Sequence, residues 1–186
     1  QNIFTDTFNE KQKPIVIENI QARIRANILM AYANQHKSLL LTTGNKSEIA
    51  MGYCTLYGDT CGALNILSDI FKTSVYKLAH HINTIHPNTI PSSSLTKAPT
   101  AELKPNQKDA DTLPSYDILD PILENHIEHN QTTEQIIKKG FDPKTVKSII
   151  KKYNQNEFKR SQLCTGLRIS NKAFGSGRRM PIAAQK

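Results

Sequence analysis

The sequence predicts an α/β fold with a small parallel sheet, on the strength of three observations. Apolar residues recur at helical spacing over residues 17–34, a short apolar run covers residues 38–45, and a second helical pattern covers residues 72–83. The order helix, buried strand, loop and helix is typical of α/β folds. Only the run at 38–45 is a strong strand candidate, so the predicted sheet is either small or continued by chain that precedes residue 1.

The first helix is expected to be amphipathic, because Ile17, Ile20, Ile24 and Ile28 are spaced three or four apart with polar residues between them. Its alanines would permit close packing against another helix. The run at 38–45 ends in Gly-Asn, which predicts a parallel strand buried on both faces and followed at once by a helix.

Residues 87–121 contain six of the nine prolines, so helix is not expected over most of this stretch. Loops this long in compact domains are often lids or binding loops. After this stretch, Thr132 predicts the start of a helix and Gly140 predicts its end. Asp142 and Pro143 predict the start of another helix. The chain is therefore divided into an α/β part (1–86), a substrate and ATP loop (87–115), and C-terminal helices with an irregular basic tail (116–186).

Composition, cysteine content and charge argue against membrane and secretory proteins and point to phosphate-bearing partners. No apolar run approaches the roughly 18 residues of a membrane-spanning helix, and residues 1–6 do not resemble a secretory signal, so no membrane partner is expected. Three separate cysteines fit a reducing cytoplasm. Lys and Arg number 11 against 13 Asp and Glu in residues 1–133, but 13 against 3 in residues 134–186. Such a basic region attracts phosphates of any kind.

Thr43 and Glu48 follow the predicted strand, at the edge where open α/β sheets bind ligands. Thr43 could offer a hydroxyl group to a nucleotide, and Glu48 could hold Mg²⁺ beside phosphates. The alternative is structural, because Asn45 and Glu48 have the spacing of a capping box. The residues alone leave both interpretations open.

Asn19 and Arg23 lie four residues apart and so share a helix face, which suits a ligand with a carboxylate or phosphate. A solvated polar face explains the pair equally well. The acidic residues at 107–111 of the proline-rich loop could be metal ligands or a solvated surface, and the residues alone favour the surface. The histidine pairs lack the arrangement of a metal site, and no Ser-His-Asp or Cys-His pattern predicts a nucleophile.

Six segments together resemble the NAD synthetase family in order and spacing over almost the whole chain. They are ENIQARIRANILMAYAN (18–34), LLLTTGNKSEIAMGYCTLYGD (39–59), the lysine of DIFKTSVYKLA (69–79), LTKAPTAELKPNQKDADTLPSYDILD (95–120), NEFKRSQ (156–162) and AFGSGRRMPI (173–182). The resemblance implies a Rossmann-like ATP pyrophosphatase fold of the adenine nucleotide alpha hydrolase type. TLYGD and the basic tail resemble the glutamine-dependent branch, in which a nitrilase-like glutaminase domain comes first.

The family's reaction is the ATP-dependent amidation of deamido-NAD (nicotinate adenine dinucleotide) to NAD, with Mg²⁺ and with ammonia or glutamine-derived ammonia. The resemblance implies that Asn19 and Arg23 contact deamido-NAD and that Thr43 and Thr100 contact ATP. Lys72 would bind the ATP phosphates, and Glu48 would bind Mg²⁺ or the dinucleotide. Lys159 would be catalytic, reaching the substrate or the developing negative charge, and Asp59 is a further candidate. A cytoplasmic homodimer or higher homo-oligomer is also implied.

Two departures from the family pattern limit what is carried over. Phe158, Leu56 and Ala63 stand where ammonia-only relatives carry His, Lys and Asp, so contacts particular to that branch are not expected here. The chain also contains no S-G-G-x-D-S phosphate loop. We therefore expect it to be the C-terminal portion of a synthetase domain without the first strand and phosphate loop, and inactive alone.

Two other classes of protein remain as alternatives. The basic C-terminal third fits a helical nucleic-acid-binding module, but 6% aromatic residues, no Trp and no nucleic-acid motif argue against a nucleic-acid partner. A non-catalytic dimerisation remnant is the second alternative. Salt-sensitive binding to DNA or RNA would favour the first, and dimers that bind no nucleotide the second.

Overall fold

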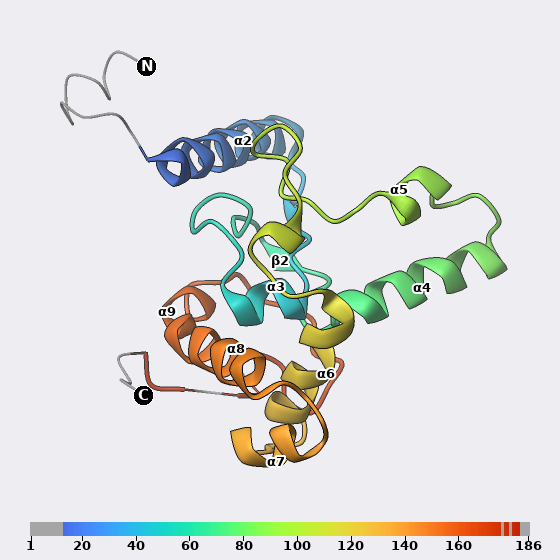
Figure 1. The fold of residues 1–186 in the computed structure, drawn as a ribbon. Helices are drawn as coiled ribbons and strands as arrows, with labels where there is room; N and C mark the ends of the chain where they lie inside the picture. Colours follow the sequence, from blue (N-terminus) through green and yellow to red (C-terminus); the bar gives the residue numbers. More distant parts are fainter. Residues whose placement is uncertain (1–12, 176, 179, 183–186) are drawn as a thin grey trace.

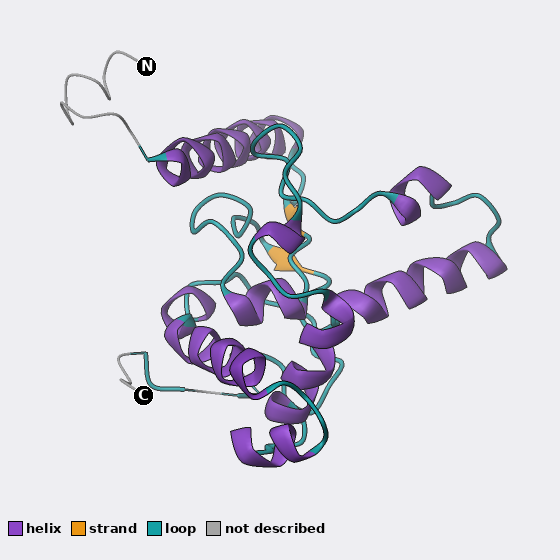
Figure 2. Cartoon of the chain, in the orientation of Figure 1, coloured by secondary structure: helices purple, strands orange, loops and turns teal. Residues whose placement is uncertain are grey.

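The computed structural model describes residues 13–175, 177–178 and 180–182, and most of that chain is helix and loop around a very small sheet (Figures 1 and 2). The elements are α2 (Pro14–His36), β1 (Leu41–Thr42), α3 (Lys46–Met51), β2 (Leu64–Asn65), α4 (Lys72–Ile85), α5 (Ser92–Thr96), a 3-10 turn η1 (Asp109–Asp111), α6 (Tyr116–Ile127), α7 (Thr133–Lys138), α8 (Pro143–Gln155) and α9 (Glu157–Arg160). Figure 1 places α2 at one end of the molecule and α6–α9 at the other, with the strands and α3 between them.

The two strands run parallel, with Leu41 beside Leu64 and Thr42 beside Asn65. A single parallel bridge between Asn65 and Gly166 adds a segment from near the C-terminus. The expected parallel strand is confirmed, but burial on both faces is wrong, because Leu39 and Leu41 are exposed. Thr42 is the buried residue of β1, and Leu41 lines a cavity.

Most members of the hydrophobic core come from the C-terminal half of the chain, and α3 adds two from the N-terminal half. Its members come mainly from α3, α6, α7 and α8: Ala50, Met51, Leu113, Leu119, Ile122, Leu123, Ile127, Ile136, Val146, Ile149, Ile150 and Tyr153. Thr132 caps α7 through a capping box with Gln135, and the Asp142 side chain caps α8. The helix starts predicted at Thr132 and Asp142 are therefore confirmed.

Helix α2 confirms the expected helix, and the residues that it buries are alanines rather than isoleucines. Ile17, Ile24 and Ile28 are exposed, whereas Ala22 and Ala26 are buried. The small alanines face inward because loop 55–60 approaches closely: a Cβ added at Gly58 would lie 2.9 Å from the Ala22 Cβ. The isoleucine stripe therefore faces away from the rest of this chain.

Most of the proline-rich stretch lacks α-helix, as expected, but two helical segments occur in it. Helix α6 continues through Pro121, and α5 forms a further turn between the prolines. Proline removes a donor from the helix interior, but α6 stays helical because Leu119, Ile122 and Leu123 bury their side chains completely in the core. Among the residues described, none of the helices has both the length and the apolar character needed to cross a membrane.

Candidate functional site

A cavity of about 570 Å³ lies between α2, the end of β1, α3 and the loop around Thr100. It brings together seven of the eight residues singled out from the sequence: Asn19, Thr43, Glu48, Asp59, Lys72, Thr100 and Lys159. These residues come from segments up to 140 positions apart. Arg23 is the exception, because its Nε donates to the Leu56 carbonyl oxygen at 3.1 Å and its side chain does not line the cavity.

Glu48 forms the capping box that the sequence offered as the structural interpretation, and its carboxylate also pairs with Lys72. Its backbone N–H donates to the Asn45 side chain at 3.0 Å, and its carboxylate accepts the Asn45 N–H at 3.2 Å, which makes a complete capping box. The other carboxylate oxygen lies 3.1 Å from Lys72 Nζ. Both side chains remain about one-fifth exposed at the cavity wall. The Glu48 carboxylate therefore caps α3 and also forms an ion pair with Lys72.

The opposite wall carries a chain of hydrogen bonds from α2 to the loop after α3. Thr55 Oγ1 donates to Asn19 Oδ1 at 2.8 Å, and the Thr55 N–H donates to Asp59 Oδ1 at 2.6 Å. Burial raises the pKa of Asp59, although the Thr55 N–H opposes that rise. The amide of Asn19 and the carboxyl group of Asp59 are therefore held in fixed relative positions by a single threonine.

Lys159 reaches the cavity from α9 and binds the chain just after α3. Its Nζ donates to the carbonyl oxygens of Gly52 at 2.7 Å and Cys54 at 2.8 Å. Gly52 ends α3 with φ of 63°, and a Cβ there would lie 2.0 Å from Asn156 Oδ1, so this approach requires glycine. The Lys159 ammonium group could release these two carbonyl oxygens and bind a ligand instead, and no ion pair would be broken.

Cys54 is not an activated nucleophile. Burial raises the pKa of its thiol to about 11, although Lys159 acts in the opposite direction. A thiol of this kind stays protonated near neutral pH. The structure therefore offers no thiolate at this position, in keeping with the absence of a nucleophile pattern in the sequence.

Sequence reasoning missed Tyr53 at this cavity and Tyr116 beside it, and it favoured a solvated surface for Asp109. Tyr53 and Asp109 line the cavity, and Tyr116 Oη donates to Asp109 Oδ2 at 2.7 Å. Lys72 Nζ lies 5.6 Å from the centre of the Tyr116 ring. Burial and the neighbouring Asp109 raise the pKa of both phenols. The QKDAD segment gave the only signal, because its acidic residues follow the Thr100 loop directly.

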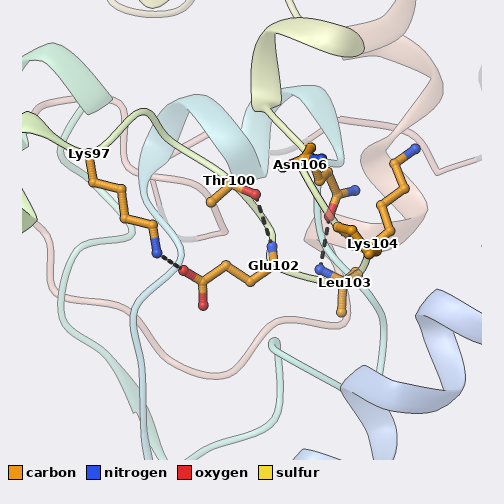
Figure 3. Close-up of a pocket in the computed structure, with 8 residues that line it drawn as sticks. Lys97, Thr100, Glu102, Leu103, Lys104 and Asn106 are labelled. Carbon is orange, nitrogen blue, oxygen red and sulfur yellow. Dashed lines mark hydrogen bonds and ion pairs between the residues drawn. The ribbon is translucent and has the colours of Figure 1, made fainter.

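The loop that carries Thr100 is tied to α2 and encloses a second, smaller hollow of about 500 Å³ (Figure 3). Lys97 pairs with the carboxylate of Glu102, and Thr100 Oγ1 accepts the Glu102 N–H at 3.1 Å. Arg25 of α2 donates to the Glu102 carbonyl oxygen at 3.2 Å. Thr100 lines both hollows, so this loop forms the wall between them.

Mg²⁺ fits this donor set only as an ion shared with a substrate. No group of three or more His, Cys, Asp and Glu side chains suited to a metal occurs in the part of the chain that the structure describes. Glu48 and Asp109 both line the cavity, and Asp109 Oδ1 is buried without a hydrogen-bond partner there. Mg²⁺ commonly takes one or two carboxylates and completes its shell with water and substrate phosphates.

Comparisons with known proteins agree with one another. The family model described as NAD synthase matches residues 1–163. A glutamine-dependent NAD(+) synthetase of Synechocystis sp. is 52% identical over 166 residues, covering 89% of this chain and 30% of the relative. One from Acinetobacter baylyi is 50% identical, covering 89% of this chain and 31% of the relative. The chain thus spans about a third of the length of these curated relatives.

Solved structures show the same fold. A glutamine-dependent NAD(+) synthetase from Cytophaga hutchinsonii aligns with a TM-score of 0.73 at 22% identity, over 98% of this chain and 31% of that one. An NH3-dependent NAD synthetase from Campylobacter jejuni aligns with a TM-score of 0.63 at 26% identity, over 85% of this chain and 57% of that one. The expected ATP pyrophosphatase fold is confirmed, and the chain belongs to the NAD synthase family.

Proposed function

We propose that the chain contributes the substrate site for the ATP-dependent amidation of deamido-NAD to NAD. The observation that carries the proposal is the single cavity that gathers Asn19, Thr43, Glu48, Lys72 and Lys159. Amide, hydroxyl, carboxylate and ammonium groups in one hollow suit a ligand with both ribose hydroxyls and phosphates. In this reaction the nicotinate carboxylate attacks the α-phosphorus of ATP and pyrophosphate leaves. Ammonia then displaces AMP from the adenylylated carboxylate.

Lys72 and Lys159 have the main electrostatic roles in this proposal. Lys72 lies at the start of α4 beside Glu48, where its charge would bind the ATP phosphates and oppose the charge that develops on departing pyrophosphate. Lys159 enters through α9 and would bind the substrate or the negative charge that develops as the adenylyl group is transferred. No covalent intermediate with the protein is needed, which agrees with the protonated thiol of Cys54.

The polar residues of the other walls would fix the ligands. Asn19, held by Thr55, would bind deamido-NAD, and Thr43 and Thr100 would bind ATP. Asp59 would help to position the dinucleotide. Arg23 would take part from outside the cavity, by releasing the Leu56 carbonyl. Glu48, with Asp109 nearby, would hold Mg²⁺, which when bound neutralises phosphate charge.

The isoleucine stripe of α2 supports a homodimer. The side chains of Ile17, Ile24 and Ile28 are exposed on one face of α2, which is a regular helix over Pro14–His36. Exposed apolar patches of this kind mark interaction surfaces in many proteins. We infer that a second copy of the chain covers this stripe.

The test is a chimera in which this chain replaces its matching region in the Acinetobacter baylyi relative. It is assayed with MgATP, deamido-NAD and either glutamine or ammonium, with an NAD-specific readout. We expect turnover, and a loss of about 100-fold or more in Lys72→Met and in Lys159→Met, because each removes a charge at the phosphates. Lys147→Met is the matched control, since Lys147 is exposed on α8 and does not line the cavity.

The outcome of the chimera assay decides between the proposal and its alternatives. Undiminished turnover in both Lys72→Met and Lys159→Met would contradict the proposed site. The 186-residue chain assayed alone with ammonium is expected to form no NAD, because its sequence contains no S-G-G-x-D-S loop. NAD formation by that chain at a rate like that of the chimera would show that the ATP phosphates bind elsewhere.

A further inference from the structure

Helix α4, which begins with Lys72, has no side-chain cap of its own. Phe71 occupies the position before the helix and makes no capping hydrogen bond. The first backbone N–H groups of any helix have no partner within it and need acceptors from elsewhere. Two other helices supply these acceptors.

Ser47 of α3 and Asp120 of α6 meet at the start of α4. The Lys72 N–H donates to Ser47 Oγ at 2.9 Å, and the Thr73 N–H donates to Asp120 Oδ2 at 2.8 Å. Ser47 Oγ in turn donates to Asp120 Oδ1 at 2.6 Å. Both side chains are buried, so water does not compete for these hydrogen bonds. Figure 1 shows the start of α4 beside α3 and α6.

This junction controls the two residues that form the charged pair in the cavity. Ser47 immediately precedes Glu48, and Asp120 binds the residue that immediately follows Lys72. Neither Ser47 nor Asp120 lines the cavity. A carboxylate at a helix N-terminus is stabilised by the helix dipole and by charge-assisted hydrogen bonds. Asp120 can therefore affect the cavity through the backbone that carries Lys72 and, through Ser47, the backbone that carries Glu48.

We propose that Asp120 is a positioning residue, which caps α4 together with Ser47 and holds Lys72 against Glu48 for phosphate binding. This inference rests on the proposed function, because it assumes that Lys72 binds the ATP phosphates. Asp120 itself touches no ligand. Its removal therefore affects ligands that carry phosphates and spares ligands that do not.

The test measures Kd for MgATP and for adenosine on the full chain by NMR titration, which detects weak binding. Asp120→Ala is expected to raise Kd for MgATP about tenfold and to leave Kd for adenosine unchanged. Asp120→Asn should recover most of the affinity, because Asn can accept the Thr73 N–H and donate to Ser47. It also keeps the test valid where the alanine variant folds poorly.

A double-mutant cycle shows whether Asp120 acts through Lys72. Lys72→Met alone should weaken MgATP binding, and Asp120→Ala added to it should weaken binding no further. Asp142→Ala is the matched control, since it removes an equivalent capping carboxylate from α8, away from the cavity. It should leave both Kd values unchanged.

Two outcomes separate this inference from the proposed function. Weaker MgATP binding in Lys72→Met beside unchanged binding in Asp120→Ala would overturn the role of Asp120 alone. Equal MgATP affinity in wild type and Lys72→Met would overturn the proposed role of Lys72, and the inference with it. A parallel loss of MgATP and adenosine affinity in Asp120→Ala would show a general structural role and would also overturn the inference.

Discussion

Replacing Lys46 with methionine is expected to destabilise the chain by about 3–5 kcal/mol, the usual cost of removing one partner from a buried ion pair. Lys46 is fully buried, and its Nζ lies 2.6 Å from Asp69 Oδ1 and in contact with the Glu128 carboxylate. It also donates to Ser170 Oγ at 2.9 Å. Methionine fills most of the same volume but leaves both carboxylates without their cation.

The loss of stability in Lys46→Met is expected to be large because Lys46 belongs to a buried cluster that joins two distant segments of the chain. Asp69 also accepts the N–H groups of Ile169 and Ser170, at 2.8 and 2.6 Å, so the cluster holds the C-terminal segment against the loop before α4. The rings of Phe71 and Phe174 lie 5.3 and 5.8 Å from the ammonium group. For a chain of this length the expected loss corresponds to about 6–20 °C in Tm.

The assay is urea and thermal unfolding followed by circular dichroism. Lys97→Met is the control, because Lys97 forms an exposed ion pair whose loss should change the free energy of unfolding little. Lys46→Met should lower the free energy of unfolding by clearly less in an Asp69→Asn background than in wild type, because residue 69 is then neutral and leaves no unpaired buried charge. A Lys46→Met variant within about 1 kcal/mol of wild type would refute the reasoning.

Four further predictions concern the site, the loop, the helix α2 and pH. Glu48→Gln should lower NAD formation in the chimera by orders of magnitude. Its Tm should stay nearly unchanged, because glutamine can still cap α3. Normal activity with a lowered Tm would support a capping role alone. Residues 87–114 should gain protection from hydrogen exchange when ATP and deamido-NAD bind, and equal protection would exclude a lid. Ile24→Glu with Ile28→Glu should give monomers by light scattering; unchanged dimers would place the interface elsewhere. Burial would raise the pKa of Asp69, but hydrogen bonds from Lys46, Ser170 and Ile169 lower it. Its stabilising contribution is therefore complete above the unfolded pKa of about 3.9 and is lost as pH falls through the lower folded value, so wild type and Asp69→Asn should converge in urea unfolding below about pH 4.

Local signals in the sequence predicted the helices and their caps well. Thr132, Asp142 and the Asn45–Glu48 box all cap helices as their spacing indicates, because caps depend on residues only a few positions apart. The buried face of α2 was not predictable in this way. Its alanines pack inward because loop 55–60 approaches them, and no local pattern encodes that approach.

The site was predicted through motif order rather than through chemistry at each residue. Spacing alone left Glu48 open between a cap and a ligand, and the structure shows one carboxylate in contact with both Asn45 and Lys72. Asp109 was interpreted as solvated surface and Tyr116 was missed, because the hydrogen bond between them joins η1 to α6 and no local pattern indicates it. Strand β2 was missed because it is two residues long and has no alternating pattern.

The central claim is that the cavity between α2, β1 and α3 binds the nucleotide and dinucleotide substrates. Threonine-methyl NMR of the chain, titrated with MgATP and then with deamido-NAD, tests it most directly. Thr43 and Thr100 line the cavity, whereas Thr145 lies at the start of α8 and hydrogen-bonds Asp142. We expect saturable shifts of the Thr43 and Thr100 methyl signals, with the Thr145 signal unchanged. Shifts at Thr145 without shifts at Thr43 and Thr100 would contradict it.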